Sequence, residues 1–361
     1  MAVKGFFLKA GIMGVMLLGL PFLGIVLAGM PVGQYLEFPP ETRYVRPAPF
    51  SWVAFSGYGL FILVVVAPLA LKGLKALWRS GTGSGVSRPF PWWGWLSIAT
   101  GLITWVLAWA RFSWFSSFQP YTFLPLWLSY VLFVNSLSYR RNGHCMMLDR
   151  PRFFLLLFPG SAAFWWFFEY LNRFVQNWHY MGVHFSLWEY FWHATLSFST
   201  VLPAVLGTRE WILGSSRFDL EFRAFFPIRL PRPRGIAWTI LILAGLGLAG
   251  IGVYPDFLFP LLWISPLLII VSLQTLMREH HVLQNVSLGD WRMVASSALA
   301  ALFCGWFWEM WNFYSLARWE YAVPFVHRYK IFEMPLLGLA GYLPFGLECA
   351  VVADMFDSSG S

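Results

Sequence analysis

The chain has 361 residues, of which 58% are hydrophobic, 20% are aromatic and only 12% are charged. A soluble fold carries roughly 25% charged residues, so this composition excludes a soluble globular protein. The formal net charge of +8 comes from basic residues spread over several loops without a nucleic-acid-reading motif. We therefore expect these basic residues to contact membrane lipids, and we predict no nucleic-acid partner.

Apolar runs of about 20 residues, the length that crosses a bilayer as a helix, recur along the whole sequence. They stay apolar instead of alternating, which favours helices over a β-barrel. We therefore predict an all-α fold, a polytopic transmembrane helical bundle of about ten spans. The predicted spans lie near residues 5–30, 50–71, 92–110, 121–138, 153–171, 189–206, 236–254, 257–276, 293–312 and 335–353.

The 25 Lys and Arg residues are distributed unevenly between the loops. Positive charge stays on the cytoplasmic side of short loops, and most of these residues fall inside when the N-terminus is placed in the cytoplasm. The first apolar run is too long for a secretory signal, and Lys9 interrupts it. We predict a multi-pass protein of a bacterial-type inner (plasma) membrane with both termini cytoplasmic.

Two halves of the chain carry similar residues in the same order. Pro120 and Pro125 open one predicted span, and Pro255 and Pro260 open another with the same spacing. Since each half holds an even number of spans, the pattern predicts a duplicated four-helix unit in parallel orientation. The predicted organisation is a two-span N-terminal appendage (1–91), a first repeat (92–206), a basic cytoplasmic linker (207–235), a second repeat (236–353) and a disordered tail (354–361).

Each half also contains a Glu-x-x-Asn motif within a span, Glu169 with Asn172 and Glu309 with Asn312. Ionisable groups inside spans are costly, which makes each a functional candidate. Glu and Asn three residues apart share a helix face. We interpret the two Glu as acid and base candidates, with the two Asn as ligand-binding residues that orient them. An Asn that ties down the following loop is the structural alternative.

Aromatic residues and a second carboxylate accompany each motif. Glu189 and Glu333 open the next predicted span in each half and are further ligand-binding candidates. The aromatic candidates are Trp165, Trp166, Trp178, Tyr180, Trp306, Trp308, Trp311, Trp319 and Tyr321. Aromatic walls suit a ring-bearing, polyene or sugar ligand with a polar end, or a cation held over aromatic faces. Trp and Tyr also gather at membrane interfaces regardless of function.

Histidines are concentrated in the first half, where His179, His184 and His193 surround Glu189. Glu189 and His193 share a helix face, an arrangement that suits a metal ion or a proton relay. The second half has Leu337 in place of His193. We therefore predict no metal site, keep the three histidines as weak candidates, and expect their uneven distribution to make the two carboxylate environments unequal. No motif identifies a cofactor.

Three functions remain open from the sequence. The first is an inner-membrane protein that binds an amphiphilic small molecule, such as a lipid, isoprenoid or quinone, in the outer leaflet and acts on it by acid-base chemistry. The second is a secondary transporter, which the duplicated halves support. The third is a non-catalytic membrane subunit whose aromatic faces contact protein partners in a larger complex.

Overall fold

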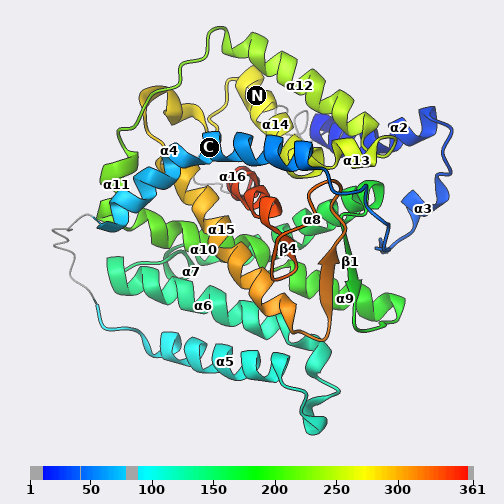
Figure 1. Cartoon of the computed structure of the whole chain (residues 1–361). Coiled ribbons are helices and arrows are strands. Elements are labelled where there is room, and N and C mark those ends of the chain that lie inside the picture. The colour runs from blue at the N-terminus through cyan, green and yellow to red at the C-terminus, as the bar shows by residue number, and fades with distance from the viewer. Residues whose placement is uncertain (1–10, 41, 79–87, 357–361) are drawn as a thin grey trace.

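The computed structural model describes residues 11–40, 42–78 and 88–356. Parts of the first predicted span and of the predicted tail, residues 5–10 and 357–361, lie outside the described residues. Helices make up most of the described chain, and its strands form two short two-stranded sheets. The chain is therefore an all-α protein (Figure 1).

The α-helices and strands follow one another in a simple order along the chain. The first half contains α2 (Leu20–Leu27), α3 (Gly33–Leu36), α4 (Trp52–Trp78), α5 (Trp92–Trp109), α6 (Phe123–Asn142), α7 (Met146–Asp149), α8 (Pro151–Val175), β1 (Trp178–Met181), α9 (Leu187–Phe198), α10 (Val201–Leu213) and α11 (Ser216–Phe222). The second half contains α12 (Pro233–Gly250), α13 (Pro255–Leu258), α14 (Pro260–Met277), α15 (Arg292–Phe313), β2 (Arg318–Tyr321), β3 (Lys330–Ile331), β4 (Met334–Pro335) and α16 (Tyr342–Asp354). The π- and 3-10 helices are η1 (Val15–Gly19), η2 (Ser113–Phe115), η3 (Gln119–Tyr121), η4 (Gln284–Leu288) and η5 (Leu336–Gly341).

Six helical segments in the described chain are long and apolar enough to cross a membrane. They are α4, α8, α12, α14, α15 and the continuous segment of η5 and α16. The chain is thus a multi-pass membrane protein. The other predicted spans are helical in their described parts, as the shorter apolar helix at Gly11–Leu27 and as α5, α6, α9 and α10.

Some predicted spans are not single α-helices in their described parts. In the span predicted at 189–206, α9 and α10 are separated at Ser199 and Thr200. The Thr200 hydroxyl donates to the carbonyl of Ser197 at 2.8 Å, and the Ser199 hydroxyl to that of Leu196 at 2.6 Å. Such bonds compete with the helix and bend it. The span predicted at 335–353 begins as the 3-10 helix η5 and continues as α16.

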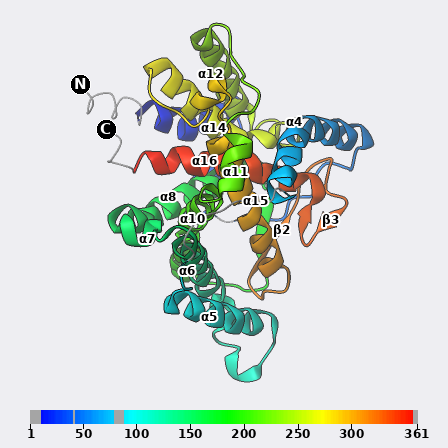
Figure 2. The same cartoon turned by 90° about the vertical axis from the view of Figure 1, so that its left-hand side faces the viewer.

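The helices pack in two sets, one in each half of the chain. Helix α5 packs against α6 and α12 against α14, while α10 contacts α6 and α8 in the first half and α16 contacts α14 and α15 in the second. Figure 2 shows α5 and α6 at one end of the molecule, α12 and α14 at the other, and α10, α15 and α16 between them. Contacts between α10 and α15 and between β1 and β2 join the two sets.

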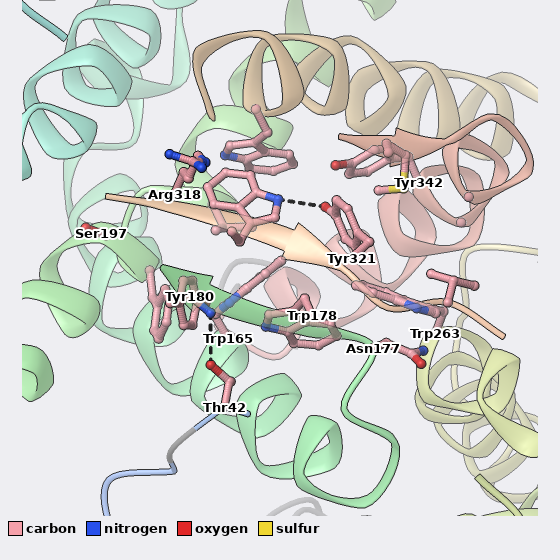
Figure 3. Close-up of a pocket in the computed structure, with 18 of the residues that line it drawn as sticks. Thr42, Trp165, Asn177, Trp178, Tyr180, Ser197, Trp263, Arg318, Tyr321 and Tyr342 are labelled. Carbon is pink, nitrogen blue, oxygen red and sulfur yellow. Dashed lines mark hydrogen bonds between the residues drawn. The ribbon is translucent and has the colours of Figure 1, made fainter. Parts of the chain in front are cut away.

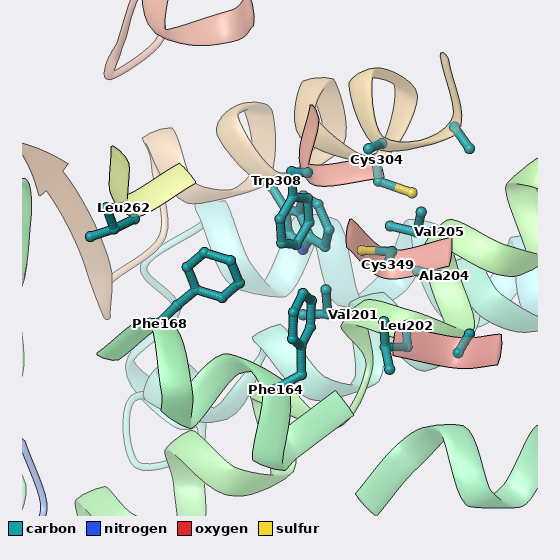
Figure 4. Close-up of a cluster of buried hydrophobic side chains, with 14 of the residues drawn as sticks. Phe164, Phe168, Val201, Leu202, Ala204, Val205, Leu262, Cys304, Trp308 and Cys349 are labelled. Carbon is teal, nitrogen blue, oxygen red and sulfur yellow. The ribbon is translucent and has the colours of Figure 1, made fainter. Parts of the chain in front are cut away.

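The core between these sets combines large aromatic side chains with aliphatic and small ones (Figure 4). Phe164 of α8 stacks on Phe345 of α16 with ring centroids 5.8 Å apart, and Phe168 stacks on Trp263 of α14 at 5.5 Å. Close backbone contact adds to this packing, because a Cβ at Gly346 would lie 2.0 Å from the carbonyl oxygen of Ser297. Since lipid tails are as apolar as this core, van der Waals packing is what stabilises it.

The two ends of the bundle differ. Strands β1 and β2 lie at one end, which we call the strand end, and α11 lies at the other, the linker end (Figure 1). At the linker end, Arg292 forms ion pairs with Asp219 at 2.6 Å and with Asp290 at 2.7 Å. Hydrogen bonds from Arg292 hold the pKa of Asp290 below its ordinary value, although partial burial opposes this shift.

Candidate functional site

The strand end is organised by the antiparallel pair of β1 and β2, which follow α8 and α15. Trp178 faces Tyr321, Tyr180 faces Trp319, and His179 faces Glu320. The pairing therefore places the Trp-x-Tyr sequences of the two strands opposite each other in reverse order. Two segments from distant parts of the chain thereby form one surface.

The two Glu-x-x-Asn asparagines hold these strands. Asn172 donates from Nδ2 to the carbonyl of Trp178 at 2.9 Å and accepts at Oδ1 from the backbone N–H of Asn177 at 2.8 Å. Asn312 binds both backbone groups of Trp319, each at 2.8 Å. Both amides are buried and lie outside the cavity described below. Their geometry is that of the structural alternative, an Asn that ties the helix to the segment after it.

Glu169 is fully buried in α8. Its Oε1 accepts hydrogen bonds from Trp165 Nε1 and Trp178 Nε1, both at 3.1 Å, and from the Tyr180 hydroxyl at 2.6 Å. Its Oε2 has no hydrogen-bond partner among the described residues. Burial raises the pKa of the Tyr180 hydroxyl well above its ordinary value, and Glu169 raises it further, which keeps this hydroxyl a proton donor.

Glu309 occupies the corresponding position in α15 with a different set of donors. Its Oε1 accepts from the Tyr321 hydroxyl at 2.7 Å and from the Tyr342 hydroxyl at 2.6 Å. Its Oε2 lacks a partner in the described part of the chain. Gly305 stands four residues before Glu309, and a Cβ there would lie 2.5 Å from the Tyr342 ring. Gly305 therefore makes the space in which Tyr342 reaches the carboxylate.

A cavity of about 800 Å³ lies beside these hydrogen-bonded groups. Trp165, Trp178 and Tyr180 line it from the first half, and Trp308, Trp319, Tyr321 and Tyr342 line it from the second. Figure 3 shows Trp165, Trp178, Tyr321 and Tyr342 gathered around the strand pair. The donors to the two buried carboxylates thus form part of the wall, with Glu169 and Glu309 directly behind it.

Six of the predicted aromatic residues line the cavity and three do not. Trp166 packs on Phe191 and donates to the Thr195 hydroxyl at 2.9 Å. Trp311 is buried against Trp127, with ring centroids 5.3 Å apart. Trp306 is largely exposed. These three side chains serve helix packing or face the surroundings of the bundle.

The second pair of predicted carboxylates has other partners. Glu189 forms a capping box with Ser186 at the start of α9, and it also accepts a hydrogen bond from Tyr121. This bond raises the pKa of Tyr121 above its ordinary value. Glu333 forms an ion pair with Lys330 at 3.2 Å. Neither carboxylate lines the cavity.

The three predicted histidines do not all line the cavity. His184 and His193 line the cavity, whereas His179 lies in β1 with its ring edge against Tyr44. Burial lowers the pKa of His179, and Glu320 partly offsets this effect. Within residues 11–40, 42–78 and 88–356, no group of three His, Cys, Asp or Glu side chains is arranged to hold a metal ion.

Several cavity residues were missed by sequence reasoning. Helix α4 contributes Tyr58, Phe61, Ile62, Val65 and Val66, whose spacing of three and four residues forms one helical stripe. Tyr342 and Arg318 were also missed. The sequence does not single out the stripe of α4, because Leu60, Leu63 and Val64 between its members are apolar as well.

Comparisons with known proteins identify no relative of this chain. No protein-family model matches the chain, and no curated protein and no solved structure matches it.

Proposed function

We propose that this protein binds an amphiphilic small molecule, such as a lipid, an isoprenoid or a quinone, in the aromatic cavity at its strand end. The cavity lies within the range of volumes of ligand pockets, roughly 300 to 1,000 Å³. One observation carries the proposal: the otherwise largely apolar wall contains the hydroxyls of Tyr180, Tyr321 and Tyr342, each bonded to a buried carboxylate. An apolar ligand with a polar group would satisfy both parts of this wall.

The same hydrogen bonds support acid-base chemistry on the bound molecule. Each tyrosine hydroxyl donates to a Glu. The Tyr180 and Tyr342 hydroxyls can accept a proton from a ligand at the same time, whereas the Tyr321 hydroxyl already accepts a hydrogen bond from Trp319 Nε1 at 2.8 Å. A proton would then move from the ligand to the hydroxyl while the hydroxyl proton moves to Glu169 or Glu309. Such a positioned donor-acceptor pair is what general acid-base catalysis requires.

The proposal includes a membrane arrangement of about ten spans in a bacterial-type inner membrane, with both termini cytoplasmic. In it, two four-helix units in parallel orientation are related by a pseudo-twofold axis along the membrane normal. The strand register supports this axis, because the pairs Trp178 with Tyr321 and Tyr180 with Trp319 exchange under a twofold rotation. His179 and Glu320 would then face each other at the axis.

The binding proposal is tested by filling the cavity from α4. Val65 lines the cavity and is 52% exposed, while Leu63 is 63% exposed and does not line it. Val65→Trp therefore extends into empty space, and Leu63→Trp is its matched control. Native mass spectrometry with lipid identification should find one amphiphile retained by the wild type and Leu63→Trp and lost from Val65→Trp. Identical bulk-lipid profiles in all three would refute the proposal.

The acid-base part needs a second comparison. Turnover of the retained amphiphile by the wild type is measured beside Glu169→Gln and Glu309→Gln, which keep an acceptor oxygen but lose the carboxylate. We expect turnover to fall by about 100-fold or more in each variant. Full turnover in both would assign the two residues to structure alone.

A secondary transporter is the second candidate, favoured by the position of the cavity between corresponding segments of the two halves. Saturable uptake of the retained amphiphile into proteoliposomes, abolished by Val65→Trp but not by Leu63→Trp, would support transport. Binding without uptake would support the first candidate.

A further inference from the structure

The cavity wall contains one cationic Lys or Arg side chain among the described residues. Arg318 lines the cavity, and among the described residues no Lys, Asp, Glu or other Arg does so. The guanidinium contacts Glu320 Oε1 at 3.4 Å, a long ion pair between side chains that are each 31% exposed. Since a guanidinium has several N–H donors in a planar fork, this contact leaves donors for a ligand. Glu320 itself does not line the cavity.

Further polar groups lie at the same end of the strand pair. Met181 faces Arg318 in the register, and His184 follows three residues later and lines the cavity. The two chains are in contact here, because a Cβ at Gly182 would lie 1.9 Å from the carbonyl oxygen of Leu316. Figure 3 shows Arg318 at one end of the pocket and Trp263 and Asn177 at the other. The cavity thus has one cationic end.

The apolar part of the wall extends from this level into the bilayer. Helix α4 starts at the strand end, where Ser51 N–H donates to Phe325 O at 3.0 Å. Along the helix axis, Tyr58 and Val66 lie about 9 and 21 Å from Trp52. The cavity-lining stripe of α4 therefore covers about 12 Å of depth within a membrane-crossing helix.

Helix α4 is also loosely attached beside the cavity. Its main contacts are with α11 at the linker end and with η5, and Ala76 is its one buried side chain. The cavity-facing stripe consequently has few protein neighbours, although hydrocarbon could cover it. A chain lying along this stripe would enter from the bilayer without crossing the polar surface.

We propose that the ligand is an anionic amphiphile whose phosphate or carboxylate head binds Arg318 while its hydrocarbon chain lies along the α4 stripe. This inference rests on the proposed binding function and adds the charge and the orientation of the ligand. The phosphate and carboxylate cases share one chemistry, a planar or tetrahedral oxyanion held by a guanidinium.

The test uses three probes with the same chain: hexadecyl phosphate, hexadecanol and hexadecyltrimethylammonium. Their binding to the full-length protein in detergent is titrated by native mass spectrometry. The wild type should bind the phosphate at least about tenfold more tightly than the alcohol, because hydrogen bonds between charged groups contribute about 1.5 kcal/mol or more. The cation should bind more weakly than the alcohol.

Substitutions then test whether Arg318 causes the preference for the phosphate over the alcohol. Arg318→Gln should reduce the phosphate preference by about tenfold, Arg318→Lys should keep part of it, and Arg328→Gln, outside the cavity, should leave it unchanged. If Arg318→Gln leaves the preference intact, or if the wild type has none, the inference is wrong. In that case the proposed function would still hold if all three probes bind saturably to the wild type and Val65→Trp abolishes this binding. Probe binding that Val65→Trp does not affect would refute both.

Discussion

Replacing Glu169 by Ala or by Gln separates its hydrogen bonds from its charge. Three donors, Trp165, Trp178 and Tyr180, meet at its Oε1. Ala removes the acceptor from all three donors, of which Trp178 is buried and Trp165 and Tyr180 are partly buried, and at about 1 kcal/mol each the free energy of unfolding should fall by about 3 kcal/mol. Gln offers a carbonyl oxygen in the same place, so Glu169→Gln should lie within about 1 kcal/mol of the wild type.

The measurement is unfolding in mixed micelles with increasing dodecyl sulfate. Cys145, Cys304 and Cys349 are buried free thiols, so their reaction with a fluorescent maleimide reports unfolding without an added label site. The expected order of stability is wild type, then Gln close behind, then Ala far below. If the Ala and Gln variants unfold together, the hydrogen bonds of Glu169, two of which join α8 to β1, do not stabilise the fold and the reasoning fails.

The other predictions concern packing, the linker end and the strand pair. Gly346→Ala should destabilise the protein by about 1–3 kcal/mol in the same assay, while Gly73→Ala, which meets no atom within 4 Å, should not. Asp290→Asn should lower stability at pH 7 by about 0.5–1 kcal/mol. Because Arg292 holds the pKa of Asp290 below its ordinary value, this contribution is present above about pH 4 and is lost as the pH falls through the lowered pKa. The variant should therefore lose less stability than the wild type between pH 5 and pH 2. Asn312→Ala should speed amide hydrogen exchange in β2, and unchanged exchange would contradict its role in holding that strand.

The positions of the helices could be predicted because bilayer length and continuous apolarity leave few alternatives. The long described helices overlap the predicted spans, from α4 at 50–71 to α16 at 335–353, whereas the short helices α3, α7 and α11 lie between them. Interruptions within a span were not predicted. The break between α9 and α10 depends on hydroxyl bonds of Ser199 and Thr200, and such bonds also form within unbroken helices.

The site could be predicted only where its residues share a local pattern. Glu169 and Glu309 were found because each stands in a repeated motif, and the structure brings their tyrosine partners to one cavity. Tyr342 lies 33 residues after Glu309, and its hydrogen bond depends on how α16 packs against α15. Helix α4, assigned to an appendage from the sequence, lines the same cavity through tertiary packing that no local pattern encodes.

The two carboxylates differ in a way that hydropathy and motif spacing do not indicate. Trp165 stands four residues before Glu169 and donates an indole N–H to it, whereas Gly305 takes that place before Glu309. The space left by the missing indole admits Tyr342, so a hydroxyl replaces the indole as a donor. The sequence suggested that uneven histidines would make the two environments unequal, but one Trp-to-Gly difference already does so at the carboxylates themselves. An indole N–H can only donate, while a hydroxyl also accepts. Glu309 is therefore bonded to two cavity-lining hydroxyls and Glu169 to one hydroxyl and two indoles, an inequality of the kind that a division into acid and base requires.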